Sequence, residues 1–382
     1  MIILIPVIGF AAAILFLRFG IYRLDGNRGG NRGGDGLEFS VVVAARDEER
    51  NIAACLESIF AQGIDKSRYE AIVVDDRSSD ATPRILREAS ERYENLRVIT
   101  VSETPPGLSP KKHAVTLGIA AASRPIVAFT DADCRVPPTW LERVGACFGD
   151  GTDLVQGVTS YSCPSGMSRL FWGLQAIDFL SHGVIAGAAI SAGLPINSNA
   201  NNMAFRRRAF AEAGGYEDSR GVVPGDDDQL MQRIWRHGRR RGADSVKFMA
   251  DPLGAVETSP TETPRALFEQ RKRWGAVTVH YGLRQVVLLS AVFAFYVSIA
   301  LTAVACAAAP RLLPIFASLI LVKLAGELAL LIPGTRIFGK KNLRKYILPA
   351  SMLHLPIVLA AVFFGVFGKF TWKGKKTGRN AA

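Results

Sequence analysis

Phe129-Thr130-Asp131-Ala132-Asp133-Cys134 is the stretch on which the predicted fold of this 382-residue chain depends. The apolar run from Pro125 to Phe129 predicts a buried strand that ends at two carboxylates. In extended backbone, residues two apart point to the same side, so Asp131 and Asp133 face one small space. Open α/β sheets bind ligands at this carboxyl edge. Paired carboxylates suit Mg²⁺ or Mn²⁺, although these two residues taken alone favour a solvated turn that caps the next helix.

Strand and helix patterns alternate on the N-terminal side of this stretch. Short β-branched runs predict strands at 39–45, 69–75 and 96–100, and amphipathic patterns predict helices at 48–62, 79–92 and 111–122. The alternation predicts an α/β fold with a mostly parallel sheet and helices on both faces. Further along we expect a helix at 137–148, a strand within 151–162, a helix at 167–192 broken near Gly183 and Gly187, a helix at 206–213 and a helix at 226–236 that ends at His237-Gly238.

Four apolar runs predict membrane-spanning helices, at residues 1–17, 286–309, 312–332 and 347–367. A cleaved signal peptide is the alternative for the first run, but no positive charge precedes it. Arginines follow the run instead, which by the positive-inside rule places the next domain in the cytoplasm. The segment 167–192 is interrupted by Gln175, Asp178 and His182, so we interpret it as a core helix or as one lying on the bilayer. The prediction is a multi-pass protein of the cytoplasmic membrane.

The charges of the C-terminal third leave its topology open. Lys323 and Glu327 lie in an apolar run, where each costs about 2.5–3.5 kcal/mol at a bilayer centre. Being four apart, they share a helix face and can pair. Basic residues fill the loop 336–345 and the tail 368–382. If all four runs span the membrane, the basic tail lies outside against the positive-inside rule, so a re-entrant segment at 347–367 is the alternative.

The composition narrows the class of protein. The chain carries a formal net charge of +12 and is 49% hydrophobic, with many basic residues beside apolar runs. This placement favours contact with anionic lipid over nucleic acid, and the Gly-rich basic segment 18–36 is interpreted as a tether near the membrane. The five cysteines are scattered and the five histidines lack zinc-site spacing. These patterns argue against a disulfide framework and a dedicated zinc site.

Charged residues gather at the predicted strand ends. Asp75 and Asp76 can accept hydrogen bonds from a base or a ribose, and adjacent acids at a sheet edge repel one another unless something binds them. Arg46 can meet a phosphate, and Glu48 a base or ribose. Lys111 begins a helix, where a cation is unfavourable unless it faces an anion, although a solvated lysine is equally consistent.

Two later clusters also carry candidate chemistry. Asp226, Asp227 and Asp228 stand at a helix start, where the dipole favours acids, but three exceed what capping requires. One of them is therefore a candidate general base. Arg273 and Trp274 precede the second membrane run. They can hold a diphosphate and stack on a sugar, or else form a cationic and aromatic belt at the membrane surface.

Taken together, these motifs resemble those of the membrane-bound family 2 glycosyltransferases. The matching stretches, in the order found in that family, are VVVAARDEERNI (41–52), VDDRSSDAT (74–82), Lys111-x-x-Ala114-x-x-x-Gly118, Asp131-Ala-Asp133, NMAFRR (202–207), Gly225-Asp-Asp227 and Gln270-x-x-Arg273-Trp274. The resemblance implies a GT-A (Rossmann-like) domain over 37–283, a nucleotide-sugar donor with a UDP-sugar expected, a divalent cation, and inversion at the anomeric carbon. Arg77 departs from the family's usual glycine and Asp226 from its usual glutamate.

The resemblance also implies a role for each matching residue. The expected donor-binding residues are Arg46, Glu48, Asp75, Asp76, Lys111 and Asp131; Asp133 would serve the metal, Asp227 would be the base, and Gln270, Arg273 and Trp274 would line the diphosphate and acceptor end. The predicted function is transfer of a sugar to a hydroxyl or phosphate of a membrane-associated acceptor, with a lipid expected. A processive polysaccharide synthase is one alternative. A transporter or scaffold that senses nucleotide-sugars is another, for which Lys323 and Glu327 argue.

Overall fold

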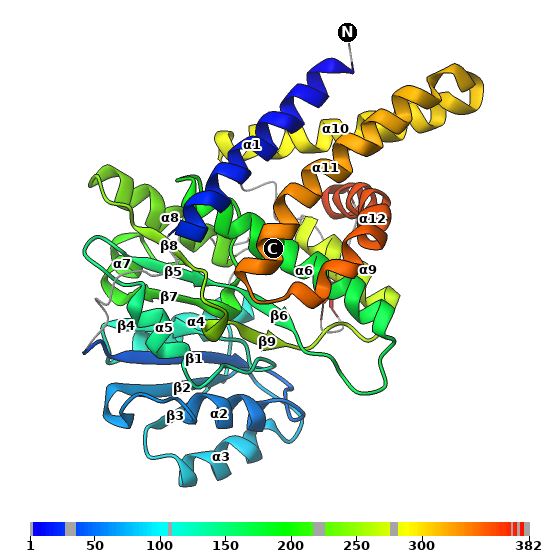
Figure 1. Ribbon diagram of the computed structural model, residues 1–382. Helices are drawn as coiled ribbons and strands as arrows, with labels where there is room; N and C mark the ends of the chain where they lie inside the picture. The colour runs from blue at the N-terminus through cyan, green and yellow to red at the C-terminus, as the bar shows by residue number, and fades with distance from the viewer. Residues whose placement is uncertain are drawn as a thin grey trace. The chain divides into compact units, whose positions relative to one another are not determined.

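The computed structural model describes residues 3–26, 36–105, 109–216, 226–275, 282–367, 370–372 and 375–377. These residues form two compact units (Figure 1). The sheet unit contains strands β1 to β9 with helices α2 to α5, α7 and α8, and the helical unit contains most of α1 together with α6 and α9 to α12. Most of the predicted tether and tail, at 27–35 and within 368–382, lies outside the described residues.

The predicted α/β sheet is confirmed. Its seven strands run in the order β3-β2-β1-β4-β7-β5-β8, and only β7 is antiparallel to its neighbours. The strands are β1 Phe39–Ala45, β2 Tyr69–Asp75, β3 Leu96–Thr100, β4 Ile126–Phe129, β5 Leu154–Gly157, β7 Met203–Arg206 and β8 Val246–Met249. The strand expected within 151–162 is two strands, because β6 Thr159–Tyr161 leaves the main sheet to pair with β9 Val256–Thr258.

Helices cover both faces of the sheet because its strands alternate their apolar side chains. Val41 and Val43 face α2 (Ile52–Phe60), and Val42 faces α4 (Pro110–Ala121). Gly118 of α4 makes that second contact possible, since a Cβ atom there would lie 2.4 Å from Val42 Cγ1. The other helices of this unit are α3 Thr82–Arg92, α5 Trp140–Ala146, α7 Arg207–Glu212 and α8 Asp226–Arg240.

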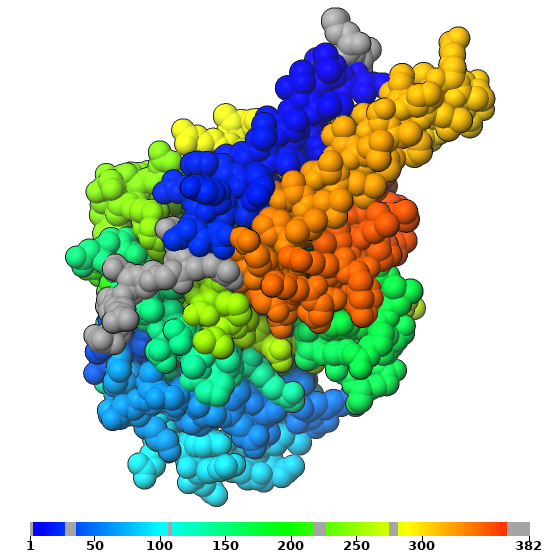
Figure 2. Space-filling model, viewed as in Figure 1, coloured from blue at the N-terminus to red at the C-terminus, as the bar shows by residue number. Residues whose placement is uncertain are grey.

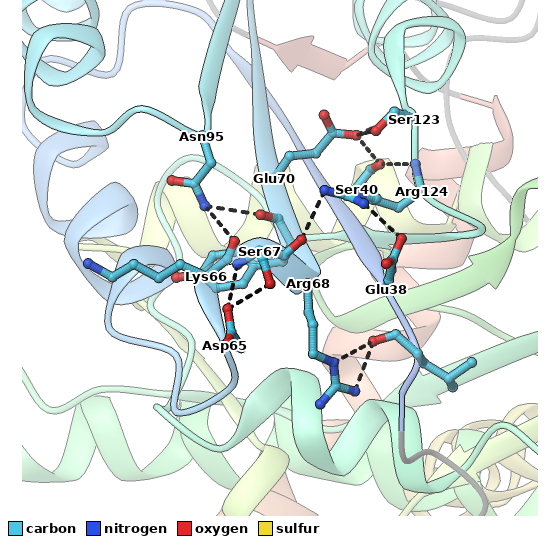
Figure 3. A network of polar contacts seen from close by, with 12 residues as sticks. Glu38, Ser40, Asp65, Lys66, Ser67, Arg68, Glu70, Asn95, Ser123 and Arg124 are labelled. Atoms are coloured by element: carbon cyan, nitrogen blue, oxygen red, sulfur yellow. Dashed lines mark hydrogen bonds and ion pairs between the residues drawn. The ribbon is translucent and has the colours of Figure 1, made fainter.

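A network of polar side chains joins the strands at the amino edge of the sheet (Figure 3). Glu70 of β2 accepts hydrogen bonds from the Ser40 hydroxyl of β1 (2.5 Å) and from the Ser123 backbone (2.7 Å) just before β4. Arg124 bonds to Glu38 (2.8 Å) and to the carbonyl of Ser67 (2.9 Å). The polar groups of the amino edge thus bond to one another and hold the strands together. The candidate ligand-binding groups lie at the opposite, carboxyl edge.

Two helices run further than their sequences suggest. The helix α6 (Arg169–Ser191) is continuous through Gly183 and Gly187, so the predicted break is wrong. The helix α8 continues through His237 and Gly238 to Arg240. Gly238 allows a close approach here and does not stop the helix, because a Cβ atom at this position would lie 2.1 Å from Ser245 Oγ.

The helical unit contains four long apolar helices besides α6. They are α1 Leu4–Gly26, α10 Leu283–Ala308, α11 Leu313–Ile337 and α12 Ile347–Phe367, accompanied by α9 Pro264–Gly275 and the short strands β10 Phe370–Trp372 and β11 Lys375–Thr377. Among the described residues, these four and α6 are long and apolar enough to cross a membrane. Figure 2 shows α1, in dark blue, lying against α11, in orange, where Gly326 of α11 faces Phe10.

The first helix extends past Leu17 to Gly26, so the expected tether does not begin at Arg18. The apolar pattern continues beyond the arginine, and Ile21 is fully buried. Gly20 lets α1 approach the backbone of α6, because a Cβ atom at Gly20 would lie 1.9 Å from the carbonyl oxygen of Ala188. Packing against α6 therefore keeps this segment helical.

The charges inside α11 pair with each other, as their spacing predicts. Lys323 Nζ lies 2.7 Å from Glu327 Oε1 and also donates to the carbonyl of Ser351 (2.7 Å). His354 Nδ1 (3.1 Å) and the Tyr296 hydroxyl (3.2 Å) contact the same carboxylate. One polar cluster thus joins α10, α11 and α12, and it gives these charges a structural role.

Candidate active site

The loops after β1 and β2 are joined to each other at the carboxyl edge of the sheet. The backbone N–H groups of Glu48 and Glu49 donate to Thr82 Oγ1 (2.8 Å) and Asp80 Oδ2 (3.0 Å). In return, Asp47 accepts from the backbone of Ser79 (2.7 Å). These bonds hold residues 48–51 and 79–81 outside the helices, which is why α2 and α3 begin three or four residues later than their sequences predict.

Asp75 and Asp76, the predicted nucleotide-binding carboxylates, lie at the end of β2 and are almost fully buried. Asp75 accepts from the backbone N–H of Ser78 (3.2 Å). Asp76 accepts from Arg46 (3.5 Å) and from Arg77 (2.9 Å). The positive charges of Arg46 and Arg77 compensate the negative charge of Asp76.

Asp131 and Asp133 follow β4 at the same edge. Lys111, near the start of α4, lies 2.8 Å from Asp131, so this lysine does face an anion. Partial burial and the nearby carboxylates of Asp131 and Glu48 raise the pKa of Asp133, although the residue keeps an exposed surface. Asp131, Asp133 and Glu48 therefore crowd negative charge into one region that the first and fourth strands share.

Asp227 reaches this edge because β7 runs antiparallel to β4. Met203, the first residue of β7, pairs with Phe129, the last residue of β4, so the loop before β7 lies beside Asp131. In that loop Ala200 donates its backbone N–H to Asp227 (2.9 Å), and Ser198 donates its own to Asp228.

Asp227 is also linked electrostatically to the carboxylate cluster. Burial raises the pKa of Asp227, and the positive charge of Lys111 opposes that rise. Lys111 thus interacts with both Asp131 and Asp227. One cation joins two acids that are about a hundred residues apart in the chain.

The donor set at this edge fits a hard divalent cation. The crowded carboxylates of Asp131, Asp133 and Glu48 are the ligand type that Mg²⁺ and Mn²⁺ prefer, and a cation would offset the repulsion that raises the pKa of Asp133. Within the described ranges, no group of three or more His, Cys, Asp or Glu side chains has metal-binding geometry. That is compatible with an ion held by few protein carboxylates together with the phosphates of a substrate.

The remaining predicted site residues belong to the helical unit. Gln270, Arg273 and Trp274 lie on α9. Gln270 accepts a hydrogen bond from the neighbouring Arg271 (2.6 Å), and the Trp274 ring stacks on Phe179 of α6 at 5.8 Å between ring centroids. The eight predicted site residues from Arg46 to Asp227 therefore lie in one unit and these three in the other.

Sequence reasoning missed the groups that hold Asp227 in place. They are the backbone N–H groups of Ser198 and Ala200, and no side-chain pattern identifies a backbone donor. Asn202 belongs to the matching motif NMAFRR, is fully buried, and bonds to Trp140 (3.0 Å) and to the carbonyl of Val158 (2.7 Å). The polar run 197–202 predicts a loop that enters a short strand, but it does not predict the contact of this loop with Asp227.

Comparison with known proteins gives a consistent family. Residues 40–212 match the family model of glycosyl transferase family 2. Glycosyltransferase AglE of Haloferax volcanii is 38% identical over 128 residues, which are 33% of this chain and 41% of that protein. The beta-monoglucosyldiacylglycerol synthase of Synechocystis sp. is 27% identical over 243 residues, 61% of this chain and 46% of that protein. The chain spans less than half the length of these two curated relatives.

A solved structure shares the fold over nearly the whole chain. It is the mannosyltransferase PcManGT from Pyrobaculum calidifontis, in complex with GDP-Man and Mn²⁺. The similarity has a TM-score of 0.58 at 18% identity and covers 96% of this chain and 99% of that one. The shared architecture is a GT-A domain accompanied by apolar helices.

Proposed function

This chain carries a family 2 glycosyltransferase domain, and from this premise we propose that it transfers a sugar from a nucleoside diphosphate sugar to a membrane-associated acceptor. The observation that carries the proposal is that pairing of β7 with β4 brings the loop that holds Asp227 beside Asp131, which Lys111 contacts at 2.8 Å. A diphosphate, a cation and a general base are needed within one small space for this reaction. The carboxylates and the lysine supply complementary charge for all three.

In the proposed reaction Asp227 takes the proton of an acceptor hydroxyl. The hydroxyl oxygen then forms a bond to the anomeric carbon while the bond from that carbon to the diphosphate oxygen breaks, which inverts the anomeric centre. Lys111 and Arg46 bind the diphosphate, and Glu48, Asp75 and Asp76 orient the base and ribose. Asp131 and Asp133 would hold a Mg²⁺ or Mn²⁺ ion, which would neutralise charge on the departing nucleoside diphosphate.

We propose a lipid as the acceptor. Five apolar helices of membrane-spanning length accompany the domain, which favours a substrate that lies in or at a bilayer. The name of the Synechocystis relative, a beta-monoglucosyldiacylglycerol synthase, points to the same class of acceptor. The donor proposed for this chain is a UDP-sugar, with Gln270, Arg273 and Trp274 serving the diphosphate and acceptor end.

Replacing the proposed base tests the mechanism directly. We expect Asp227→Asn to lower sugar transfer by about 10²- to 10⁴-fold, because asparagine cannot accept the acceptor proton. Binding of the nucleoside diphosphate, measured by isothermal titration with Mn²⁺ present, should stay near the wild-type value. As a matched control, Asp228→Asn keeps an acceptor for the N–H of Ser198 and should retain most of the activity. Near-normal turnover by Asp227→Asn would reject the role.

A donor screen identifies the product class. Membranes containing the protein are incubated with labelled nucleotide-sugars and Mn²⁺ or Mg²⁺, and the products are extracted into organic solvent. We expect label to enter the lipid fraction as a single product. A ladder of products would instead identify a processive polysaccharide synthase. Purified protein that binds nucleotide-sugars but turns none over would point to a sensor or scaffold.

A further inference from the structure

The polar residues that interrupt α6, namely Gln175, Asp178 and His182, contact the segment that leads into and forms α9. The two helices lie side by side in Figure 1. Asp178, Phe179 and His182 follow Gln175 by three, four and seven residues, so the four side chains form one stripe along the helix. The rest of α6 is largely apolar, and a helix of this composition has no need of polar residues for its own stability. The contacts of Gln175, Asp178 and His182 therefore indicate the role of this stripe.

Gln175 holds the chain just before α9. Its side chain is 1% exposed, and its Oε1 atom accepts from the Thr261 hydroxyl (2.6 Å) and the Thr261 N–H (3.1 Å). Its Nε2 atom donates to the Thr261 carbonyl (3.1 Å). A buried amide that exchanges three hydrogen bonds with one residue fixes that residue's backbone. The entry to α9 is thereby set from α6.

Asp178 holds the middle of α9 through Arg271. Its Oδ2 atom accepts from both Nε (2.9 Å) and Nη2 of Arg271, whose side chain is only 7% exposed. The same guanidinium donates from Nη1 to Gln270 Oε1 (2.6 Å) and lies 4.2 Å from the centre of the Trp274 ring. A guanidinium is a rigid planar fork, so the carboxylate that orients it also orients the amide and the ring.

The last turn of the stripe holds Trp274 itself. Phe179 stacks on the indole at 5.8 Å, and His182 meets it edge-on at 5.1 Å between ring centroids. The indole is thus bounded by two α6 side chains and by the guanidinium of Arg271. Aromatic contacts of these geometries favour one ring orientation over the others.

We propose that Gln175, Asp178 and His182 are positioning residues that hold α9 so that Gln270 and Trp274 present a fixed acceptor-binding surface. This proposal rests on the proposed function, in which those two residues serve the acceptor end. Asp178 is the central member because its carboxylate accepts two hydrogen bonds from Arg271, which in turn contacts both Gln270 and Trp274. The proposed donor-binding residues belong to the sheet unit, whereas these three positioning residues belong to the helical unit.

Removing the carboxylate tests the proposal. In full-length protein in detergent, we expect Asp178→Asn to lower kcat/KM for the acceptor about ten- to a hundredfold, as misplacement of binding groups does. The dissociation constant for nucleoside diphosphate should stay unchanged. Asp178→Glu keeps the charge and should recover part of the loss. The matched control is Glu269→Gln, which breaks the α9 ion pair with Lys272 (2.9 Å) but not the contacts of Gln270 or Trp274, and should behave as wild type.

A double variant separates positioning from folding. Asp178→Leu with Arg271→Met replaces the ion pair by apolar groups, a change that proteins often tolerate without loss of stability. We expect wild-type thermal unfolding but still defective acceptor use, because Gln270 no longer accepts a hydrogen bond from Arg271. Wild-type acceptor kinetics in both Asp178→Asn and the double variant would overturn the proposal, and so would an equal loss of donor affinity.

Hydrogen exchange gives a readout that does not depend on catalysis. Backbone amides of 264–274 should exchange faster in Asp178→Asn than in the wild type, and at the wild-type rate in Glu269→Gln. If wild-type protein transfers no sugar from any donor, the proposed function fails while exchange still tests the contact between α6 and α9. If transfer occurs but exchange and acceptor kinetics are unchanged in Asp178→Asn, the positioning role alone fails.

Discussion

At the scale of single residues, the structure gives a reason for the arginine at position 77, where family 2 glycosyltransferases usually have glycine. Its φ angle is +56°, in the left-handed region where glycine is free of strain. The Arg77 guanidinium forms an ion pair of 2.9 Å with Asp76, whose side chain is almost fully buried. The guanidinium therefore compensates backbone strain by neutralising a carboxylate that the proposed nucleotide pocket uses.

Two substitutions separate these effects. Arg77→Ala and Arg77→Gly both remove the ion pair, but only alanine keeps the left-handed strain. We expect the glycine variant to be more stable than the alanine variant by roughly 1 kcal/mol, measured by denaturant unfolding in detergent. Equal stability of the two variants would show that the loop relaxes around this position and stores no strain.

At the scale of elements, Glu70 joins three strands at the amino edge. It bonds to Ser40 on β1 and to Ser123 before β4, while itself lying on β2. Burial opposes ionisation of this carboxyl, but the hydrogen bonds from Ser40 and Ser123 outweigh it and lower the pKa of Glu70. Stability from such a group is present above the ordinary glutamate pKa and is lost as pH falls through the lower folded value.

Because the pKa of Glu70 is lowered, its contribution to stability can be tested by substitution and by changing the pH. At neutral pH, Glu70→Gln should unfold more easily than wild type by about 1–2 kcal/mol, because the hydrogen bonds then go to a neutral amide oxygen instead of a charged carboxylate. The gap should narrow as pH falls below the ordinary glutamate pKa, as judged from thermal unfolding midpoints. Glu88→Gln, in an exposed pair with Arg84, is the control and should change little. A gap that stays constant with pH would contradict the assignment.

At the scale of the whole molecule, strand pairing decides which apolar helices can cross a membrane. The strands β4 and β5 precede α6 and β7 follows it, yet β7 pairs with both in one sheet. Both ends of α6 must then lie on the same side of a bilayer. The burial of α6 agrees, since 67% of its most apolar stretch is buried, against 28% or less in the other four candidates. Four candidate crossings remain: α1, α10, α11 and α12.

Cysteine labelling tests the resulting topology. With α1 crossing first and the sheet unit in the cytoplasm, the basic segment between α11 and α12 is also cytoplasmic. In a cysteine-free background we expect Asn342→Cys, an exposed position, to react with a membrane-impermeant maleimide in inverted vesicles but not in intact cells. Labelling in intact cells would reverse the proposed orientation. A cysteine at position 382 then reports whether α12 crosses.

The sequence by itself predicted the first four strands of the main sheet, their mostly parallel arrangement and the carboxylates at their ends, because burial of each strand face imprints a local period on the chain. It also predicted the pairing of Lys323 with Glu327, since one helix turn separates them. It did not predict β8 or β9. Helix starts were less predictable: Glu48 and Ser79 give their N–H groups to a neighbouring loop, and local periodicity does not report such partners.

Only the tertiary structure decided how Asp227 reaches Asp131 and what the polar residues of α6 contact. The first depends on β7 inserting antiparallel between β4 and β5, and the second on a stripe of α6 meeting a helix about ninety residues further along the chain. Contacts between distant segments arise from packing and loop closure, which no short stretch of sequence encodes.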